Sequence, residues 1–443
     1  MFCNNKDLIE TLYKEEIFQN LSKPITLKGG NLSYFYADFR KLYTKPELLN
    51  MVANKLSSII PKNTNYLAGT PLGAIPITTL LSNKLNIPFL LVRPNVKSHG
   101  SKCLIEGEID PPTSNITIIE DVITTGQSSL ETYKKLKEIF PLAKINIVIS
   151  IFNRLEHDLF SYPFKIRSLL NSNDTLLNYY NSTKPNHTTA QKLFNLVEKK
   201  LSNLIYSADQ TDSSQLLIIL EQVAPYIIAV KLHTDSLKDP VTPQFISKLT
   251  ELATKYDFII IEDRKFTDIG STLKNQLTSN LNIVNWADAI TVFPCVTKSG
   301  IDLINNLDLA PIIIEELTSY QDNDNNPYSF RSKDLISSFK KERSTVSVEM
   351  PDQRSTVSDE TPDQRYIGTI GQYNTSKWQF SPGISLTKTT DNINQNYRTP
   401  EEAVKTGADF FIVGRSIFQS ENPKLKAKIY REKCWKAKLL SIC

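Results

Sequence analysis

Eight short apolar segments recur through the second half of the chain, and helical stretches separate most of them. Eight buried strands that alternate with helices in about 240 residues fit a closed (β/α)₈ barrel. The pattern therefore predicts an α/β fold with a C-terminal TIM barrel over residues 196–443. The expected strands are Leu204–Ala208, Ile227–Leu232, Phe258–Glu262, Ala289–Phe293, Pro311–Glu315, Tyr366–Ile370, Gln379–Ser381 and Asp409–Val413.

The first part of the chain alternates in the same way. Helices are expected around Glu47–Ile59, Ala74–Leu85 and Ser128–Phe140, and strands at Tyr66–Thr70, Pro88–Val92, Ile116–Asp121 and Ile145–Phe152. This order predicts a separate parallel-sheet domain over residues 1–170. A stretch rich in Asn, Ser and Thr with Pro185 follows, and we expect the linker at 171–195. A chain of 443 residues is also long enough for two cores.

One segment breaks the pattern of the second half. Arg343–Gln353 reads RSTVSVEMPDQ, and Arg354–Gln364 repeats it as RSTVSDETPDQ. Both copies are polar, lack an apolar stripe and contain a proline, which argues against a coiled coil. We expect a disordered surface insertion at 343–364.

Composition excludes several classes of protein. The net charge of +4 is too small for a general nucleic-acid binder. The five cysteines form no C-x-x-C pair, so a zinc or disulfide framework is not expected. No apolar run reaches the roughly 18 residues of a membrane helix, and no signal peptide is visible. We expect a cytoplasmic protein without nucleic-acid or membrane partners.

The strongest motif of the first part is IIEDVITTGQS, Ile118–Ser128. A buried strand ends in two acids, a small hydroxyl-rich loop with one glycine follows, and a helix begins. Backbone N–H groups at a helix start bind phosphate well, and the acids suit ribose hydroxyls. The candidate binding residues are Glu120, Asp121, Thr124, Thr125, Gly126, Gln127 and Ser128.

This string resembles the diphosphoribosyl-binding motif of phosphoribosyltransferases. Further segments resemble the orotate phosphoribosyltransferase family over roughly residues 7–165, and they supply the substrate-binding candidates Lys28, Tyr36, Arg93 and Arg154. The segment Arg93–Gly100 resembles the family's catalytic loop, in which Lys97 and His99 would act on departing pyrophosphate. The resemblance implies Mg²⁺, held mainly by the diphosphate and with no direct protein ligand, and a dimer with shared sites. One departure is Pro94, where the family usually has a lysine.

The second part carries an array of lysines and aspartates after its expected strands. Asp263-Arg-Lys-Phe-Thr-Asp268-Ile-Gly follows one strand, Lys231-x-His233 ends another, and Asp209 follows a third. These positions lie at the carboxyl ends of barrel strands, where barrel active sites are built. Burying this many charges in a purely structural network would cost much free energy of desolvation, so a functional site is the better interpretation.

The array resembles that of orotidine-5'-phosphate decarboxylases, over roughly residues 200–432. The resemblance implies catalytic roles for Lys231, Asp263, Lys265 and Asp268, with no cofactor. It implies substrate contacts from residues that follow the strands, with Ile269 and Thr272 entering the partner subunit's site beside Asp268. The remaining substrate-binding candidates are Asp209, His233, Thr318, Pro382, Gln395, Tyr397, Gly414 and Arg415. Thr318 stands where the family has a serine.

The two resemblances together match the order of the fused UMP synthases. They imply two activities, orotate phosphoribosyl transfer and then decarboxylation to UMP, with small-molecule substrates only. One alternative keeps both folds but makes one domain a weakened, phosphate-binding regulatory module. Another is a different sugar-phosphate barrel enzyme, such as a hexulose-phosphate synthase, against which the complete D-R-K-F-x-D-I-G string argues.

Overall fold

The computed structural model describes residues 5–26, 32–95, 103–154, 162–316, 335, 365–371, 378–387, 389–390 and 396–442. Two compact units divide the chain, one formed by Met1–Asn178 with Ser441–Cys443 and the other by Tyr179–Leu440. The expected insertion at 343–364 lies outside the described residues.

The N-terminal unit is built on a six-stranded sheet in the order β5-β4-β3-β6-β7-β8. All its neighbouring strands are parallel except the pair β4 and β5. The strands are β3 Tyr66–Gly69, β4 Phe89–Val92, β5 Ile105–Glu106, β6 Asn115–Ile123, β7 Lys144–Asn153 and β8 Lys165–Asn171. Helices α2 (Pro46–Ser57), α3 (Ile75–Leu85) and α4 (Gln127–Ile139) pack on β7, β3 and β6 respectively. The expected parallel α/β domain is therefore confirmed.

Several elements of this unit were not expected from the sequence, among them the short strand β5. An antiparallel hairpin of β1 (Phe18–Thr26) and β2 (Leu32–Ala37) follows α1 (Lys6–Lys14). A 3₁₀ helix, η1 (Phe39–Thr44), follows the hairpin. Strand β8 extends the sheet beyond β7.

The C-terminal unit contains a closed barrel of eight parallel strands, and all eight match expected segments. The strands are β9 Leu204–Ala208, β10 Ala229–Leu232, β11 Ile259–Phe266, β12 Ala289–Val292, β13 Ala310–Ile314, β14 Gly368–Ile370, β15 Gln379–Ser381 and β18 Phe410–Val413. The strands pair in sequence order, and β18 closes the barrel on β9. The expected TIM barrel is confirmed.

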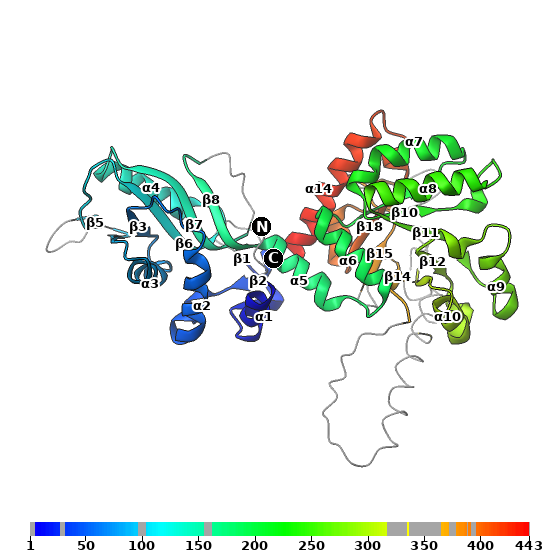
Figure 1. Ribbon diagram of the computed structural model, residues 1–443, viewed down its shortest axis with the longest axis horizontal. Coiled ribbons are helices and arrows are strands. Elements are labelled where there is room, and N and C mark those ends of the chain that lie inside the picture. Colours follow the sequence, from blue (N-terminus) through cyan, green and yellow to red (C-terminus); the bar gives the residue numbers. More distant parts are fainter. Residues whose placement is uncertain are drawn as a thin grey trace, which may run out of the picture. The chain divides into compact units, whose positions relative to one another are not determined.

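Helices lie around the barrel strands (Figure 1). They are α6 Thr188–Lys200, α7 Ser213–Val223, α8 Pro243–Tyr256, α9 Gly270–Thr278, α10 Thr297–Asn305, α12 Pro400–Lys405, α13 Arg415–Phe418 and α14 Pro423–Ile442. The short strands β16 (Thr389–Thr390) and β17 (Asn396–Tyr397) pair with each other outside the barrel. The strands are apolar on both faces because one face fills the barrel and the other packs on helices, as in Leu204–Ala208, which is wholly buried.

The segment expected to be the linker is mostly helical. Helix α5 (Ser172–Thr183) and helix α6 occupy most of 171–195, and the boundary between the units falls within α5. Leu176, Tyr180 and Leu193 are fully buried. The many Asn, Ser and Thr residues of this stretch made those apolar positions hard to recognise in the sequence. These residues have low helix propensity, so the helices depend on burial of their apolar side chains.

Candidate active site

Four charged or titratable side chains meet at the carboxyl end of the barrel. Strand β10 supplies Lys231 and leads into His233, and the adjacent β11 supplies Asp263 and Lys265. Oδ2 of Asp263 is the shared centre: it accepts from Lys231, lies 2.9 Å from Nε2 of His233 and lies 3.2 Å from Nζ of Lys265. The sequence array is therefore one contiguous cluster.

Burial sets the electrostatics of this cluster. Burial by itself would raise the pKa of Asp263, but Lys231, a hydrogen bond from His233, and Lys265 together hold that pKa well below its usual range. Burial would likewise lower the pKa of Lys231, yet the charges of Asp263 and Asp209 and the hydrogen bond to Asp263 outweigh it and raise that pKa. The lysine therefore stays an ammonium and the aspartate stays a carboxylate at neutral pH.

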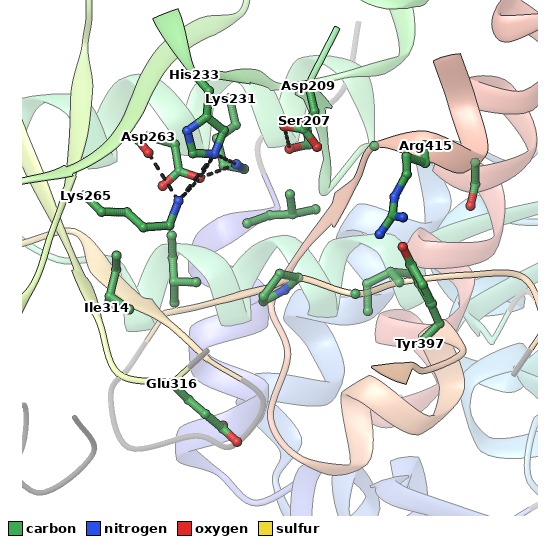
Figure 2. Close-up of a pocket in the computed structure, with 17 residues that line it drawn as sticks. Ser207, Asp209, Lys231, His233, Asp263, Lys265, Ile314, Glu316, Tyr397 and Arg415 are labelled. Carbon is green, nitrogen blue, oxygen red and sulfur yellow. Dashed lines mark hydrogen bonds and ion pairs between the residues drawn. The ribbon is translucent and has the colours of Figure 1, made fainter. Parts of the chain in front are cut away.

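A pocket of about 260 Å³ extends from this cluster across the barrel mouth. Figure 2 shows Lys231, His233, Asp263 and Lys265 grouped at one end and Tyr397 with Arg415 at the other. The Arg415 guanidinium carbon lies 5.7 Å from the centre of the Tyr397 ring.

The segment that holds Tyr397 is fixed by local hydrogen bonds. Thr399 and Glu402 form a capping box at the start of α12. The neighbouring Arg398 donates to Ser381 at 2.8 Å and to Thr406 at 2.7 Å. Tyr397 is thereby held beside the carboxyl end of β15, where Pro382 also lines the pocket.

The middle of the pocket presents acceptors and a close backbone approach. Ser207 donates to Oδ1 of Asp209 at 2.8 Å. A β-carbon on Gly414 would lie 2.9 Å from Oδ2 of Asp209 and 3.2 Å from the Ser207 carbonyl oxygen, so a larger residue would crowd this approach. The Asp209 carboxylate therefore lines the pocket between the charged cluster and Arg415, where it could accept from a ligand with several hydroxyl groups.

Three expected site residues do not line this pocket. Asp268 accepts from Gln276 at 2.6 Å, Ile269 is 58% exposed, and Thr272 is exposed. Within the described residues, these side chains lie on the surface segment from the end of β11 into α9. Thr318 and Gln395 lie outside the described residues.

Several pocket residues were missed by the sequence reasoning. Ile314 and Glu316 also line the pocket, and Figure 2 labels both. Ile314 is the last residue of β13 and Glu316 follows it closely. Because barrel sites form at the carboxyl ends of strands, this position alone could have identified both residues as candidates. The full set of missed pocket residues is Ser207, Ile314, Glu316, Ile370, Ile384, Ile412 and Ser416.

The motif of the N-terminal unit forms the expected turn between β6 and α4. Gly126 is the residue before α4, with φ of +73°, a left-handed conformation that favours glycine. Thr124, Thr125 and Ser128 surround it, and Gln127 opens the helix and donates to Glu131 at 3.0 Å. The first N–H groups of α4 are thereby placed at the carboxyl edge of the sheet.

The two acids before this turn differ in their surroundings. Glu120 is 5% exposed and accepts from Ser129 at 3.0 Å, whereas Asp121 is partly exposed and accepts from the Val122 N–H at 2.8 Å. Burial, and then the charge of Asp121, raise the pKa of Glu120 well above its usual range. Two neighbouring carboxyl groups of this kind fit a site that receives hydroxyl donors.

The expected orotate and pyrophosphate residues have the following partners. Arg93 donates through Nε to Glu106 at 2.9 Å, across the β4–β5 pair. Tyr36 accepts from Arg40 at 2.8 Å. Arg154 is 3% exposed and donates to Ser33 at 2.8 Å. Lys28, Lys97 and His99 lie outside the described residues.

Two kinds of feature are absent from the described part of the chain. No group of three or more His, Cys, Asp or Glu side chains there could hold a metal ion. None of its helices combines the length and apolarity that crossing a membrane requires.

Comparisons with known proteins match both parts of the chain. The family model "Orotidine 5'-phosphate decarboxylase / HUMPS family" matches residues 202–430. The curated "Orotidine 5'-phosphate decarboxylase" of Pichia kudriavzevii is 35% identical over 59% of this chain and 97% of its own length. "Uridine 5'-monophosphate synthase" of Bos taurus is 28% identical over 98% of this chain and 97% of its own length, and that of Naegleria gruberi is 27% identical over 93% and 92%. The chain belongs to the orotidine 5'-phosphate decarboxylase / HUMPS family.

Proposed function

We propose that this chain makes UMP from orotate in two steps. The N-terminal unit joins orotate to phosphoribosyl diphosphate, and the barrel decarboxylates the orotidine-5'-phosphate that results. The observation that carries the proposal is the cluster of Lys231, Asp263 and Lys265 at one end of a pocket whose other end holds Arg415. The similarity to uridine 5'-monophosphate synthases over almost the whole chain supports the first step.

The charged cluster suits loss of CO₂ from a pyrimidine. When the bond between C6 and the carboxyl carbon breaks, its electron pair stays on C6. The ammonium of Lys265, 31% exposed at the side chain, would stabilise that pair and then give C6 a proton. Asp263 would hold Lys231 and Lys265 in place and lie near the leaving carboxylate.

The opposite end of the pocket suits a phosphate group. Arg415 offers a guanidinium, Tyr397 a hydroxyl, and Gly414 a close backbone approach. Asp209 would accept from ribose hydroxyls between the two ends. Binding energy from this remote phosphate would be used to orient the pyrimidine over Lys265.

The proposal of a dimer rests on Asp268, Ile269 and Thr272. They do not line the pocket of their own chain. We place them in the pocket of a second copy, where Asp268 would complete the array of lysines and aspartates. The same assembly is proposed to let Lys97 and His99 of the N-terminal unit act across subunits.

The turn between β6 and α4 suits the first step. N–H groups at the start of α4 and the hydroxyls of Thr124, Thr125 and Ser128 would bind the sugar phosphate. Glu120 and Asp121 would accept from ribose hydroxyls. Tyr36, Arg154 and Lys28 are proposed contacts of orotate.

Mg²⁺ is the cofactor proposed for this first step. Burial and then the charge of Asp121 raise the pKa of Glu120, which favours a neutral carboxyl there, so the two acids do not form a pair of anionic ligands. The ion would be held mainly by the diphosphate, whose negative charge it would offset. Arg93, Lys97 and His99 would act on the same departing group. We propose that both steps take place in the cytoplasm.

One experiment tests both steps separately. Purified protein is given orotate, phosphoribosyl diphosphate and Mg²⁺ in one reaction, and orotidine-5'-phosphate alone in another. UMP is expected in both. Absence of UMP from the second reaction would contradict the barrel's role, and UMP formed only in the second would contradict that of the N-terminal unit.

A further inference from the structure

Thr291 lies behind the charged cluster and touches two of its members. It is on β12, the strand next to β11, and it is fully buried at 0% exposure. Its hydroxyl donates to Oδ1 of Asp263 at 2.7 Å and accepts from the backbone N–H of Lys265 at 3.2 Å. A threonine hydroxyl has one proton and two lone pairs, so it makes both bonds at once.

The first bond fixes the orientation of the Asp263 carboxylate. Oδ2 of this residue is already shared among Lys231, His233 and Lys265 (Figure 2). Among the described residues, Thr291 is the side-chain donor to Oδ1. Loss of the hydroxyl would leave a buried charged acceptor without that bond, which costs more than loss of a neutral one.

The second bond supports an irregular piece of backbone. After Glu262 the register between β11 and β12 shifts, and pairing resumes at Phe266. Over this interval β11 runs for more residues than β12, so it bulges. Lys265 lies in the bulge with φ of +57°, a left-handed conformation that is unfavourable for a residue with a side chain. The Thr291 hydroxyl supplies its N–H with a partner where the regular ladder is interrupted.

We infer that Thr291 is a positioning residue for decarboxylation, which holds the Asp263 carboxylate and the Lys265 backbone in fixed relation. The inference rests on the proposed function of the barrel. Thr291 does not line the pocket, so it acts through the other two residues and not on the substrate.

Two substitutions separate the hydroxyl from the shape of the side chain. Thr291→Val keeps the shape and removes the hydroxyl, and Thr291→Ser keeps the hydroxyl. With added orotidine-5'-phosphate and the full chain, Thr291→Val is expected to lower kcat about tenfold or more with KM changed less than about threefold. Thr291→Ser is expected to retain kcat within about threefold of the wild type.

Ser202 provides a matched control in the same barrel. It too is fully buried, donates to the Tyr226 carbonyl at 2.7 Å and accepts from the Leu204 N–H at 3.2 Å. It lies before β9, at the end of that strand away from the pocket. Ser202→Ala thus also removes one donated and one accepted hydrogen bond from a buried hydroxyl, and its kcat is expected to stay near that of the wild type.

The outcomes separate failure of the inference from failure of the proposed function. A wild type without decarboxylation would overturn the proposed function of the barrel itself. An active wild type with Thr291→Val equal in kcat to Ser202→Ala would overturn the inference alone, as would Thr291→Ser as slow as Thr291→Val. If Thr291→Val does not fold, Thr291→Cys replaces it: the thiol is a weak donor, and a kcat equal to that of Thr291→Ser would contradict the inference.

Discussion

Lys135 donates from its ammonium group to the carbonyl of Pro94, at 2.7 Å. The same group donates to the carbonyl of Arg93 at 3.0 Å. Lys135 lies on α4, the helix whose N-terminus forms the expected phosphate site, and Pro94 follows β4. The ammonium therefore ties the backbone at the end of β4 to the helix that would bind the sugar phosphate.

This tie leads to a first prediction about the N-terminal unit. Lys97 and His99 follow Pro94 by a few residues in the sequence, so the end of β4 sets where their segment begins. Lys135→Met is expected to lower the rate of orotidine-5'-phosphate formation about tenfold, because it removes two hydrogen bonds from a charged donor. The rate is measured with saturating orotate and phosphoribosyl diphosphate.

The control comes from the same helix. Lys137 donates to the carbonyls of Pro141 and Ala143 at 3.0 and 2.8 Å, and both acceptors follow the C-terminal end of α4. Lys137→Met removes the same kind of bonds and is expected to leave this rate nearly unchanged. Equal rates for the two variants would argue against the role of Lys135.

A second prediction separates the two proposed activities. Lys265→Ala is expected to lower decarboxylation at least about a thousandfold, since it removes the group that stabilises and protonates C6. Formation of orotidine-5'-phosphate should persist, so this intermediate should accumulate. Lys274→Ala, at an exposed position of α9, is the control. UMP formation by Lys265→Ala at the wild-type rate would refute the assignment.

A third prediction concerns the pH dependence of stability. Burial raises the pKa of Glu262 to about 8, above its ordinary value of 4.5. The folded barrel therefore keeps a proton that the unfolded chain releases above pH 4.5, so this residue makes the barrel less stable as pH rises from about 4.5 to 8. The full loss corresponds to roughly 5 kcal/mol at 1.4 kcal/mol per pKa unit.

Glu262→Gln tests this dependence because it removes the titration. Its amide oxygen can still accept from the Thr234 N–H, which Glu262 binds at 3.3 Å. The difference in unfolding free energy between Glu262→Gln and the wild type should shift in favour of the variant from pH 5 to pH 8.5. Denaturant unfolding at several pH values measures it, and a difference independent of pH would show that Glu262 does not titrate in this range.

A fourth prediction concerns magnesium. EDTA is expected to stop formation of orotidine-5'-phosphate, because the charge that builds on departing diphosphate needs a divalent ion. It should leave decarboxylation of added orotidine-5'-phosphate unchanged, since Lys231 and Lys265 supply the positive charge in the barrel. Excess Mg²⁺ should restore the first reaction. Decarboxylation that stops with EDTA and returns with Mg²⁺ would contradict the assignment.

The sequence predicted those parts of the site that depend on the spacing of residues along the chain. Asp263 and Lys265 are two residues apart after an apolar strand, and Lys231 ends the preceding strand, so a parallel barrel brings them together. Thr291 could not be predicted in this way. Its role depends on a register shift between β11 and β12, which no local pattern reveals.

The same reasoning explains what was missed in the N-terminal unit. The β4 strand was expected, but the two-residue β5 was too short to leave a pattern. The pairing of Arg93 with Glu106 depends on that strand. Arg93 was expected to contact pyrophosphate, and a sequence motif could not show that it has this partner in the folded unit.

The most direct test of the central claim follows both products of one incubation. Orotate labelled in its carboxyl group is given to the purified chain with phosphoribosyl diphosphate and Mg²⁺, and released CO₂ and UMP are quantified together. The account expects equal amounts of CO₂ and UMP, and neither product when phosphoribosyl diphosphate is omitted. Consumption of orotate with orotidine-5'-phosphate as the end product, or no consumption at all, would contradict the claim that one chain carries out both steps.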